Sequence, residues 1–286
     1  MDYVADLAEL VERYFQETPD GRIILGLNPD GPNDRELIVV GVNGVDGKPI
    51  AWVCNFSCHG TVLSQRNYVI SGDWPGPAAT QMEASLGGAC LFINGGAANI
   101  APRIDRQEDF GLVEELAAEF VSDVQKISKG LADQPESNTV GGAECTLHLP
   151  RKLRDVKEGM GKTRPIQIRG LRIGPLHILG FPGEVFSQTT IAVKANSPHA
   201  LTIVASYASG GSGVYVPVAE AYETGGYEVR ISPYSEAAEA ILAARDGKKP
   251  GREVIYPTVQ DGLAGVKFVD ACVRSSAKNA GWVKLD

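Results

Sequence analysis

Apolar and polar residues alternate along this chain with two different periods, and the period changes from segment to segment. Residues 36–42 (ELIVVGV) and 49–56 (PIAWVCNF) are apolar runs of strand length, and the turn NGVDGK between them is typical of a hairpin. A period of two in the second strand places Trp52, Cys54, Phe56 and Cys58 on one face.

Helical spacing dominates other segments. Residues 2–16 have apolar side chains three and four positions apart, and residues 111–131 repeat this pattern over a longer distance, so both are predicted to be amphipathic helices. Residues 74–88 are predicted to form a helix that begins at a proline and ends at a glycine. The remaining predicted strands are 89–93, 144–150, two within 166–184, and 200–208, and the remaining helices are 185–197 and 234–247. This alternation predicts an α/β fold with a mixed β-sheet flanked by helices.

Composition narrows the classes of function. The 286 residues carry a formal net charge of -8 with a pI of about 5.2, which argues against a nucleic-acid partner because such proteins need a basic face. No run of apolar residues is long enough for a membrane span. The first residues are acidic and amphipathic, unlike a secretion leader, so the chain as written is expected to be cytoplasmic. Five cysteines without a disulfide-like spacing are interpreted as reduced and structural.

Three polar residues lie at strand ends or in glycine-rich loops, where α/β proteins place their sites. They are His59 after the strand NFSC, Glu184 in GFPGE, and Tyr215 in GGSGVY. A zinc site needs nitrogen, sulfur or oxygen donors that meet from separate segments, and these side chains are chemically suitable. A single histidine at a strand end is also compatible with a purely structural, hydrogen-bonded role, and spacing leaves both interpretations open.

Other chemical interpretations fit the sequence less well. Cys58 as a nucleophile would need His59 as its base, but adjacent residues of a strand point to opposite faces. The loop GGAANIAPR has the glycines of an anion-binding loop but lacks the Lys-Ser/Thr of a P-loop, so a nucleotide site is not expected. His148, His177 and His199 lie within predicted elements or at a helix end and are interpreted as structural.

Four motifs occur in the order that is characteristic of one family. The segment NFSCHGTVLSQRNYVISGDWPG (55–76) resembles the NFACHPT…ISADYPG segment of the neutral/alkaline ceramidase family. LFINGGAANIAPR (91–103) resembles that family's LF-x-x-GAAGD-[IV]-x-P loop, and LGFPGEVF (179–186) its LPGE motif. GVYVPVAEAYETGGYE (213–228) is similar to the GY-[IV]-PT-x-EAYE-x-GGYE segment. The chain thus resembles part of a ceramidase-like catalytic domain, across about residues 20–246.

The resemblance implies a zinc-dependent amide hydrolase. Family members of known activity cleave the N-acyl bond of ceramide, and two histidines, a glutamate and a tyrosine hold their Zn²⁺. These roles fall on His59, Glu184 and Tyr215, and Tyr215 is also a catalytic candidate. The substrate would be a small-molecule or lipid-like N-acyl compound, with its carbonyl lined by the loop 94–103, where Gly95, Gly96 and Ala97 lie.

Asp73, in SGDWPG, has two possible roles. Histidines that bind a metal usually donate their other N–H to an acceptor, so Asp73 is a candidate to orient His59. It is equally placed to cap the helix that begins at Trp74 and Pro75. The sequence favours neither role over the other.

The chain departs from the family pattern at three places. The family's other zinc histidine lies in a THTHSGP segment, upstream of a helix like residues 2–16, and no histidine here takes that role. The aspartate and serine of the family's GD-x-S-P motif are replaced by Asn99 and Ala101, which stand at those catalytic positions. An N-acyl or ester substrate other than ceramide is therefore expected. The alternative is a catalytically inactive, truncated relative that at most binds a ligand or partner.

The last residues resemble a different family. Residues 256–285 are similar to the C-terminal helix and strand of glucose–fructose-oxidoreductase-type dehydrogenases, but no dinucleotide-binding glycine motif accompanies them. We expect a ceramidase-like domain over residues 1–250, lacking its N-terminal part, and a dehydrogenase-like tail over 251–286. The third interpretation, that the chain is a fragment of a dehydrogenase, rests on this tail alone. If a signal-bearing N-terminus is missing, the protein is expected to be secreted or periplasmic.

Overall fold

The chain divides into two compact units, residues 1–133 and 134–286, and each is described by itself. The computed structural model describes residues 11–12, 15–17, 23–25, 28, 30–63, 67–102, 109–131, 139–152, 163–210, 214–224 and 226–234. The predicted helix 234–247 beyond its first residue, and the tail 251–286, lie outside these residues. The proposed division of the chain at residue 250 therefore stays a prediction.

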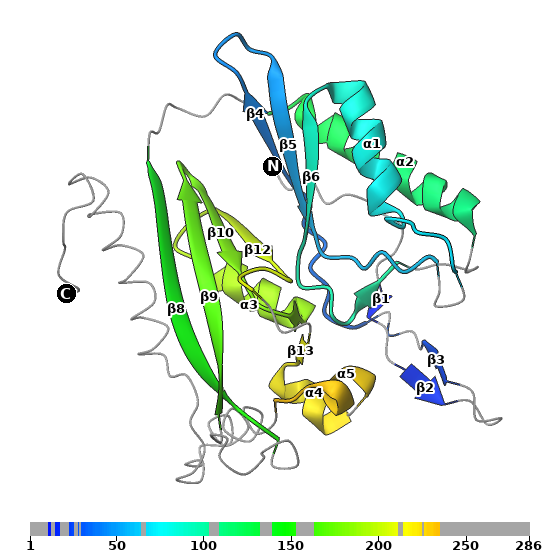
Figure 1. Ribbon diagram of the computed structural model, residues 1–286, viewed down its shortest axis with the longest axis vertical. Coiled ribbons are helices and arrows are strands. Elements are labelled where there is room, and N and C mark those ends of the chain that lie inside the picture. The colour runs from blue at the N-terminus through cyan, green and yellow to red at the C-terminus, as the bar shows by residue number, and fades with distance from the viewer. Residues whose placement is uncertain are drawn as a thin grey trace. The chain divides into compact units, whose positions relative to one another are not determined.

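A three-stranded mixed sheet forms the centre of the first unit (Figure 1). Its order is β4 (Ile38–Asn43), β5 (Pro49–Phe56) and β6 (Ala89–Asn94). β4 and β5 form the antiparallel hairpin that the turn NGVDGK predicts, whereas β6 runs parallel to β5. Because β5 and β6 are parallel, their carboxyl ends meet at the same edge of the sheet, and the segments after Phe56 and Asn94 start side by side.

Two helices accompany this sheet, and both follow sequence signals. α1 (Pro75–Leu86) begins at a proline, whose missing N–H costs nothing at that position, and ends at Gly87 with a positive φ of 74°. α2 (Phe110–Ser128) begins after Asp109, whose side chain accepts hydrogen bonds from the N–H groups of Gly111 and Leu112. Both helices agree with the predicted segments within a few residues. Figure 1 shows α1 and α2 beside β6.

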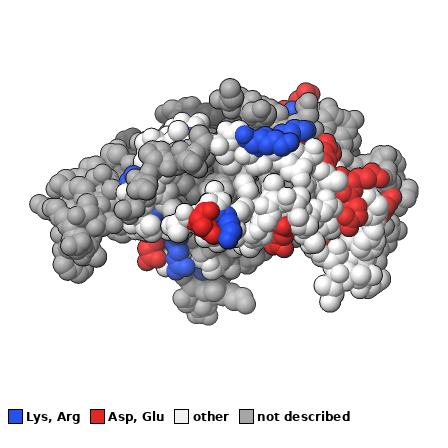
Figure 2. All heavy atoms as spheres, turned by 90° about the horizontal axis from the view of Figure 1, so that it is seen from above, with Lys and Arg blue, Asp and Glu red and all other residues white. Residues whose placement is uncertain are grey.

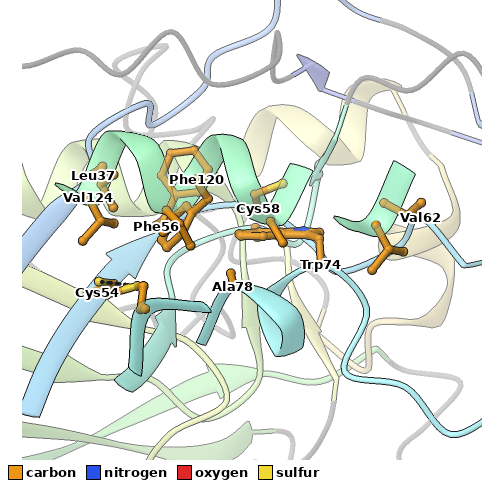
Figure 3. Close-up of a cluster of buried hydrophobic side chains, with 14 of the residues drawn as sticks. Leu37, Cys54, Phe56, Cys58, Val62, Trp74, Ala78, Phe120 and Val124 are labelled. Carbon is orange, nitrogen blue, oxygen red and sulfur yellow. Dashed lines mark hydrogen bonds between the residues drawn. The ribbon is translucent and has the colours of Figure 1, made fainter. Parts of the chain in front are cut away.

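The core of the first unit lies between these helices and one face of the sheet. Cys54, Phe56 and Cys58 are buried there and Trp52 packs against them, so the face that these four residues share is the inward face of β5. Trp74 packs edge-on against Phe92, with ring centroids 5.2 Å apart. Figure 3 shows that Phe56 and Phe120 come from opposite sides of this core, and their centroids are 6.1 Å apart. This aromatic cluster fixes the end of β5 that leads to His59.

The predicted helix over residues 2–16 is wrong where the structure describes it. Val11–Glu12 form the short strand β1, which pairs with β7 (Ile100–Ala101), and Phe15–Glu17 form β2, which pairs with β3 (Ile23–Leu25). Short strands satisfy their backbone groups through a partner strand, and a helical spacing of apolar residues does not reveal that partner. The rest of that segment lies outside the described residues.

A four-stranded sheet forms the second unit, in the order β12, β10, β9 and β8. β8 (Val140–Pro150) and β9 (Thr163–Ile173) are longer than predicted and pair antiparallel over 11 residues each. β10 (Leu176–Gly180) pairs antiparallel with β9, and α3 (Ser187–Asn196) leads to β12 (Leu201–Ala205), which is parallel to β10. The class is mixed α/β, as predicted.

Short elements complete the second unit. β11 (Glu184–Val185) follows β10 and pairs in parallel with β13 (Tyr215–Val216). The helices α4 (Ala219–Thr224) and α5 (Tyr227–Ile231) come after β13. None of the described helices combines the length and apolar character that a membrane span needs. Figure 2 shows one face of the molecule, on which acidic and basic side chains gather in small separate groups.

Candidate metal centre

His59 follows the end of β5, and its backbone is held from two sides. Its N–H donates to the carbonyl of Ile100 at 3.2 Å, and its carbonyl accepts from the indole Nε1 of Trp74 at 3.0 Å. The residue itself is half-buried. Because Trp74 is anchored in the aromatic core, these contacts place His59 at a defined position at the carboxyl edge of the sheet.

The glycine loop after β6 lies directly against this strand end. The N–H of Gly95 donates to the carbonyl of Phe56 at 2.9 Å, and the side-chain oxygen of Asn94 accepts from the N–H of Cys58 at 3.3 Å. A Cβ on Gly95 would lie 2.2 Å from the Oγ of Ser57, so only glycine permits this approach. The two strand ends are therefore held close together beside His59.

The predicted loop residues are largely buried. Gly95, Gly96, Ala97 and Asn99 are all buried, and Ala101 lies in β7, where it pairs with Val11. Small side chains fit the close packing between the strand end and this loop. A role for Gly95, Gly96 and Ala97 in lining a substrate carbonyl stays a prediction.

Asp73 organises the loop that follows His59. Its two carboxylate oxygens accept hydrogen bonds from the backbone N–H groups of Val62, Leu63 and Trp74, at 2.8–3.2 Å. It adopts a positive φ of 50°, which is uncommon outside glycine, asparagine and aspartate. These contacts tie the segment 62–63 to the start of α1. The helix itself is capped by Trp74 without a side-chain bond, and the orientation of His59 by Asp73 stays a prediction.

Glu184 and Tyr215 are brought together in the second unit. They are direct partners in the parallel pair of β11 and β13, and the N–H of Glu184 donates to the carbonyl of Val214 at 3.0 Å. Gly183 makes this approach possible, because it has a φ of 103° and an added Cβ would lie 2.4 Å from the carbonyl oxygen of Val214. The glycine of the PGE motif therefore sets the distance between the two side chains.

A second tyrosine, which the sequence analysis did not single out, completes this cluster. The hydroxyl of Tyr207 donates to Oε2 of Glu184 at 3.3 Å. The N–H of Tyr207 donates to the carbonyl of Gly183 at 3.0 Å, so the loop after β12 is bound to the PGE loop. Its position after a buried strand and before the glycines of SGGSG is the signal in the sequence that points to it.

The surroundings of these tyrosines keep them protonated. Burial, followed by the negative charge of Glu184, raises the pKa of Tyr207 above its usual range. Burial also raises the pKa of Tyr215, and the charges of Glu184 and the buried Glu228 raise it further. Both hydroxyls therefore act as donors toward Glu184 when no cation is present.

The donor set of the second unit is compatible with a zinc ion. Glu184 supplies carboxylate oxygens, and Tyr215 supplies a phenol oxygen in the adjacent strand position. Within the described part of the chain, no group of three or more His, Cys, Asp or Glu side chains is placed to hold a metal. His59 belongs to the first unit, whereas Glu184 and Tyr215 belong to the second.

The structural interpretations of the other candidates agree with their surroundings. Cys58 is 2% exposed in the aromatic core, and its thiol donates to the carbonyl of His59, so it is placed for packing. His177 and His199 stack with centroids 3.4 Å apart, and His148 lies exposed on β8.

Comparison with known proteins identifies the fold. No protein-family model matches the chain, and no curated protein has a matching sequence. A solved structure described as a ceramidase complexed with C2 matches with a TM-score of 0.57 and 17% identity, over 80% of this chain and 50% of that chain. The neutral ceramidase from Pseudomonas aeruginosa matches with a TM-score of 0.57 and 19% identity, over 80% of this chain and 49% of that chain.

The fold is that of the neutral ceramidases. This agrees with the resemblance seen in the four sequence motifs and with the predicted mixed α/β class. The chain spans about half the length of the ceramidases that it matches. At this level of identity the likeness concerns the fold alone.

Proposed function

We propose that this protein is a zinc-dependent hydrolase of an N-acyl (amide) bond. The observation that carries the proposal is the pairing of Glu184 with Tyr215 in β11 and β13, which places a carboxylate and a phenol side by side. In the resembling family, this glutamate and tyrosine are zinc ligands. The ceramidase fold of the chain supports the same assignment.

The zinc would be held by His59, Glu184 and Tyr215. These supply an imidazole nitrogen and two kinds of oxygen, and a catalytic zinc commonly has three protein ligands and one open position. Zinc supplies Lewis-acid polarisation of an acyl carbonyl and lowers the pKa of a bound water to about 7.

The residues of the chain itself would position and protect the reacting groups. The hydrogen bond from Tyr207 orients the carboxylate of Glu184. The contacts from Ile100 and Trp74 fix the backbone of His59. Tyr215 is protonated in the metal-free protein, and it would release this proton if it became a zinc ligand.

The substrate would be a lipid-like or small N-acyl compound. Asn99 and Ala101 replace the aspartate and serine of the ceramidase motif, so a different N-acyl compound or an ester is favoured over ceramide. Asn99 and Ala101 are 4% and 6% exposed, and neither carries an acidic or hydroxyl group. Any contribution that the motif serine makes to catalysis would be lost here.

Zinc content and hydrolysis of the purified full chain test this proposal. We expect near-stoichiometric zinc by elemental analysis, and a fall in zinc for His59→Ala and for Glu184→Ala. His148→Ala and Glu144→Ala, which replace exposed residues of β8, serve as matched controls. Hydrolysis of a panel of short-chain ceramide, N-acyl amino acids and acyl esters should disappear with a chelator and return with zinc. A folded chain that binds no zinc would refute the proposal.

A catalytically inactive relative is the second candidate. The replacement of the motif serine by Ala101 favours it, because an alanine supplies neither a nucleophile nor a hydrogen-bond donor. Such a protein would bind an N-acyl ligand without cleaving it. Binding of a short-chain ceramide by the zinc-loaded chain, with no product over the whole panel, would select this candidate.

A further inference from the structure

Three sulfur atoms converge in the core of the first unit. The Sγ of Cys54 lies 3.9 Å from the Sδ of Met82, and the Sγ of Cys90 lies 3.5 Å from the same atom. Both cysteine sulfurs therefore contact the same thioether.

The fold explains why they meet. Cys90 of β6 stands opposite Trp52 of β5, so Cys54 lies two residues further along β5 and on the same face. Helix α1 packs over this face and supplies Met82. Cys54 and Met82 are 0% exposed, whereas Cys90 is only partly buried.

The spacing suits a three-coordinate metal ion. A metal–sulfur bond of about 2.3 Å in a trigonal plane separates neighbouring sulfurs by about 4 Å. The observed separations of 3.5 and 3.9 Å need only a small expansion to reach this geometry. Two thiolates and a thioether are soft ligands, which select Cu(I) over the harder divalent ions.

We propose that Cys54, Met82 and Cys90 form a binding site for Cu(I). The incoming Cu⁺ would form bonds to both cysteine sulfurs and to the thioether, and the two thiol protons would be released to solvent. No change in oxidation state is involved. This site is independent of the proposed hydrolase activity and lies on different residues.

Anaerobic titration of the full chain with Cu(I), in competition with the chromogenic chelator bicinchoninate, tests this site. We expect one Cu(I) per chain that withstands the chelator, and X-ray absorption should show three sulfur neighbours at about 2.3 Å. Cys90→Ser should weaken binding about 100-fold, and Met82→Leu, which preserves volume, about tenfold. Thermal unfolding of each apo variant shows whether it is folded.

The control variant replaces two cysteines that lie outside the proposed copper site. The double variant Cys145→Ser and Cys272→Ser leaves the three sulfurs untouched and should bind Cu(I) as the original chain does. The proposal fails if folded Cys90→Ser keeps the original affinity, or if the double variant loses it. It also fails if X-ray absorption shows two sulfur neighbours, because Met82 would then not be a ligand.

Discussion

Glu184 and Tyr215 face each other as paired residues of two parallel strands that are only two residues long. Their proximity depends on the backbone of Gly183, which approaches the carbonyl of Val214 too closely for any side chain. The chemistry proposed for this protein therefore rests on a glycine that has no functional group of its own.

Gly183→Ala is expected to disrupt this pair. The substitution combines a left-handed φ with a steric clash, and we expect it to destabilise the protein by at least about 2 kcal/mol more than Gly210→Ala. Gly210 is the matched control, since its φ of 72° is also positive but nothing lies within 4 Å of an added Cβ. Urea unfolding measures both, and equal midpoints would contradict the steric argument.

Trp74→Phe is expected to loosen His59. The indole donor to the His59 carbonyl is lost and only the weaker thiol donor of Cys58 remains, so we expect a loss of about 1 kcal/mol of stability. Trp52→Phe is the control, because Trp52 makes a similar bond to the carbonyl of Gly87, away from His59. We expect zinc content to fall in Trp74→Phe and to be retained in Trp52→Phe. A loss of zinc in both would show a general effect of weakened packing.

Asp73→Asn tests whether the Asp73 carboxylate organises the loop that follows His59. The amide keeps one acceptor oxygen, but three backbone N–H groups depend on the carboxylate, so we expect a loss of about 1–3 kcal/mol. Asp46→Asn, in the exposed β4–β5 turn, should leave the unfolding midpoint close to that of the original chain. Chemical denaturation gives both values. If Asp73→Asn is fully stable but binds less zinc, Asp73 acts through His59 instead.

The stacked pair of His177 and His199 predicts a pH-dependent stability. Burial, then the charge of His199 and that of Arg172, lower the pKa of His177 below 6.5, although the carbonyl of Pro175 partly opposes this. Burial and Arg172 likewise lower the pKa of His199. The unfolded chain thus binds more protons than the folded chain, and stability is expected to fall as the pH drops below about 6.5 toward the lowered folded values.

His177→Phe separates this effect from general acid denaturation. The ring is retained for stacking, but one titrating group is removed, so the loss of stability between pH 7.5 and pH 5 should shrink. His148→Gln, at an exposed position on β8, should leave the original pH profile unchanged. Thermal unfolding over this pH range measures both variants. Identical slopes for His177→Phe and the original chain would contradict the assignment.

Most regular elements could be predicted because their local signals agree with their final environment. The alternation around Cys54 and Phe56 requires one buried face, and Pro75 and Asp109 mark where helices begin. The helix predicted for residues 2–16 fails at Val11 and Phe15, since both lie in strands that pair with other segments, Val11 with Ala101 and Phe15 with Leu25. Helical periodicity reports only on neighbours along the chain.

The sequence alone determined the elements, the glycine-rich loops and the resemblance that singles out His59, Glu184 and Tyr215. Only the tertiary structure decided which side chains meet. It placed Tyr207 against Glu184, gave Asp73 three backbone donors, and brought Met82 to two cysteines on neighbouring strands. The physical reason is that strand pairing and helix packing join segments across long stretches of chain, whereas propensity and periodicity act within a few residues.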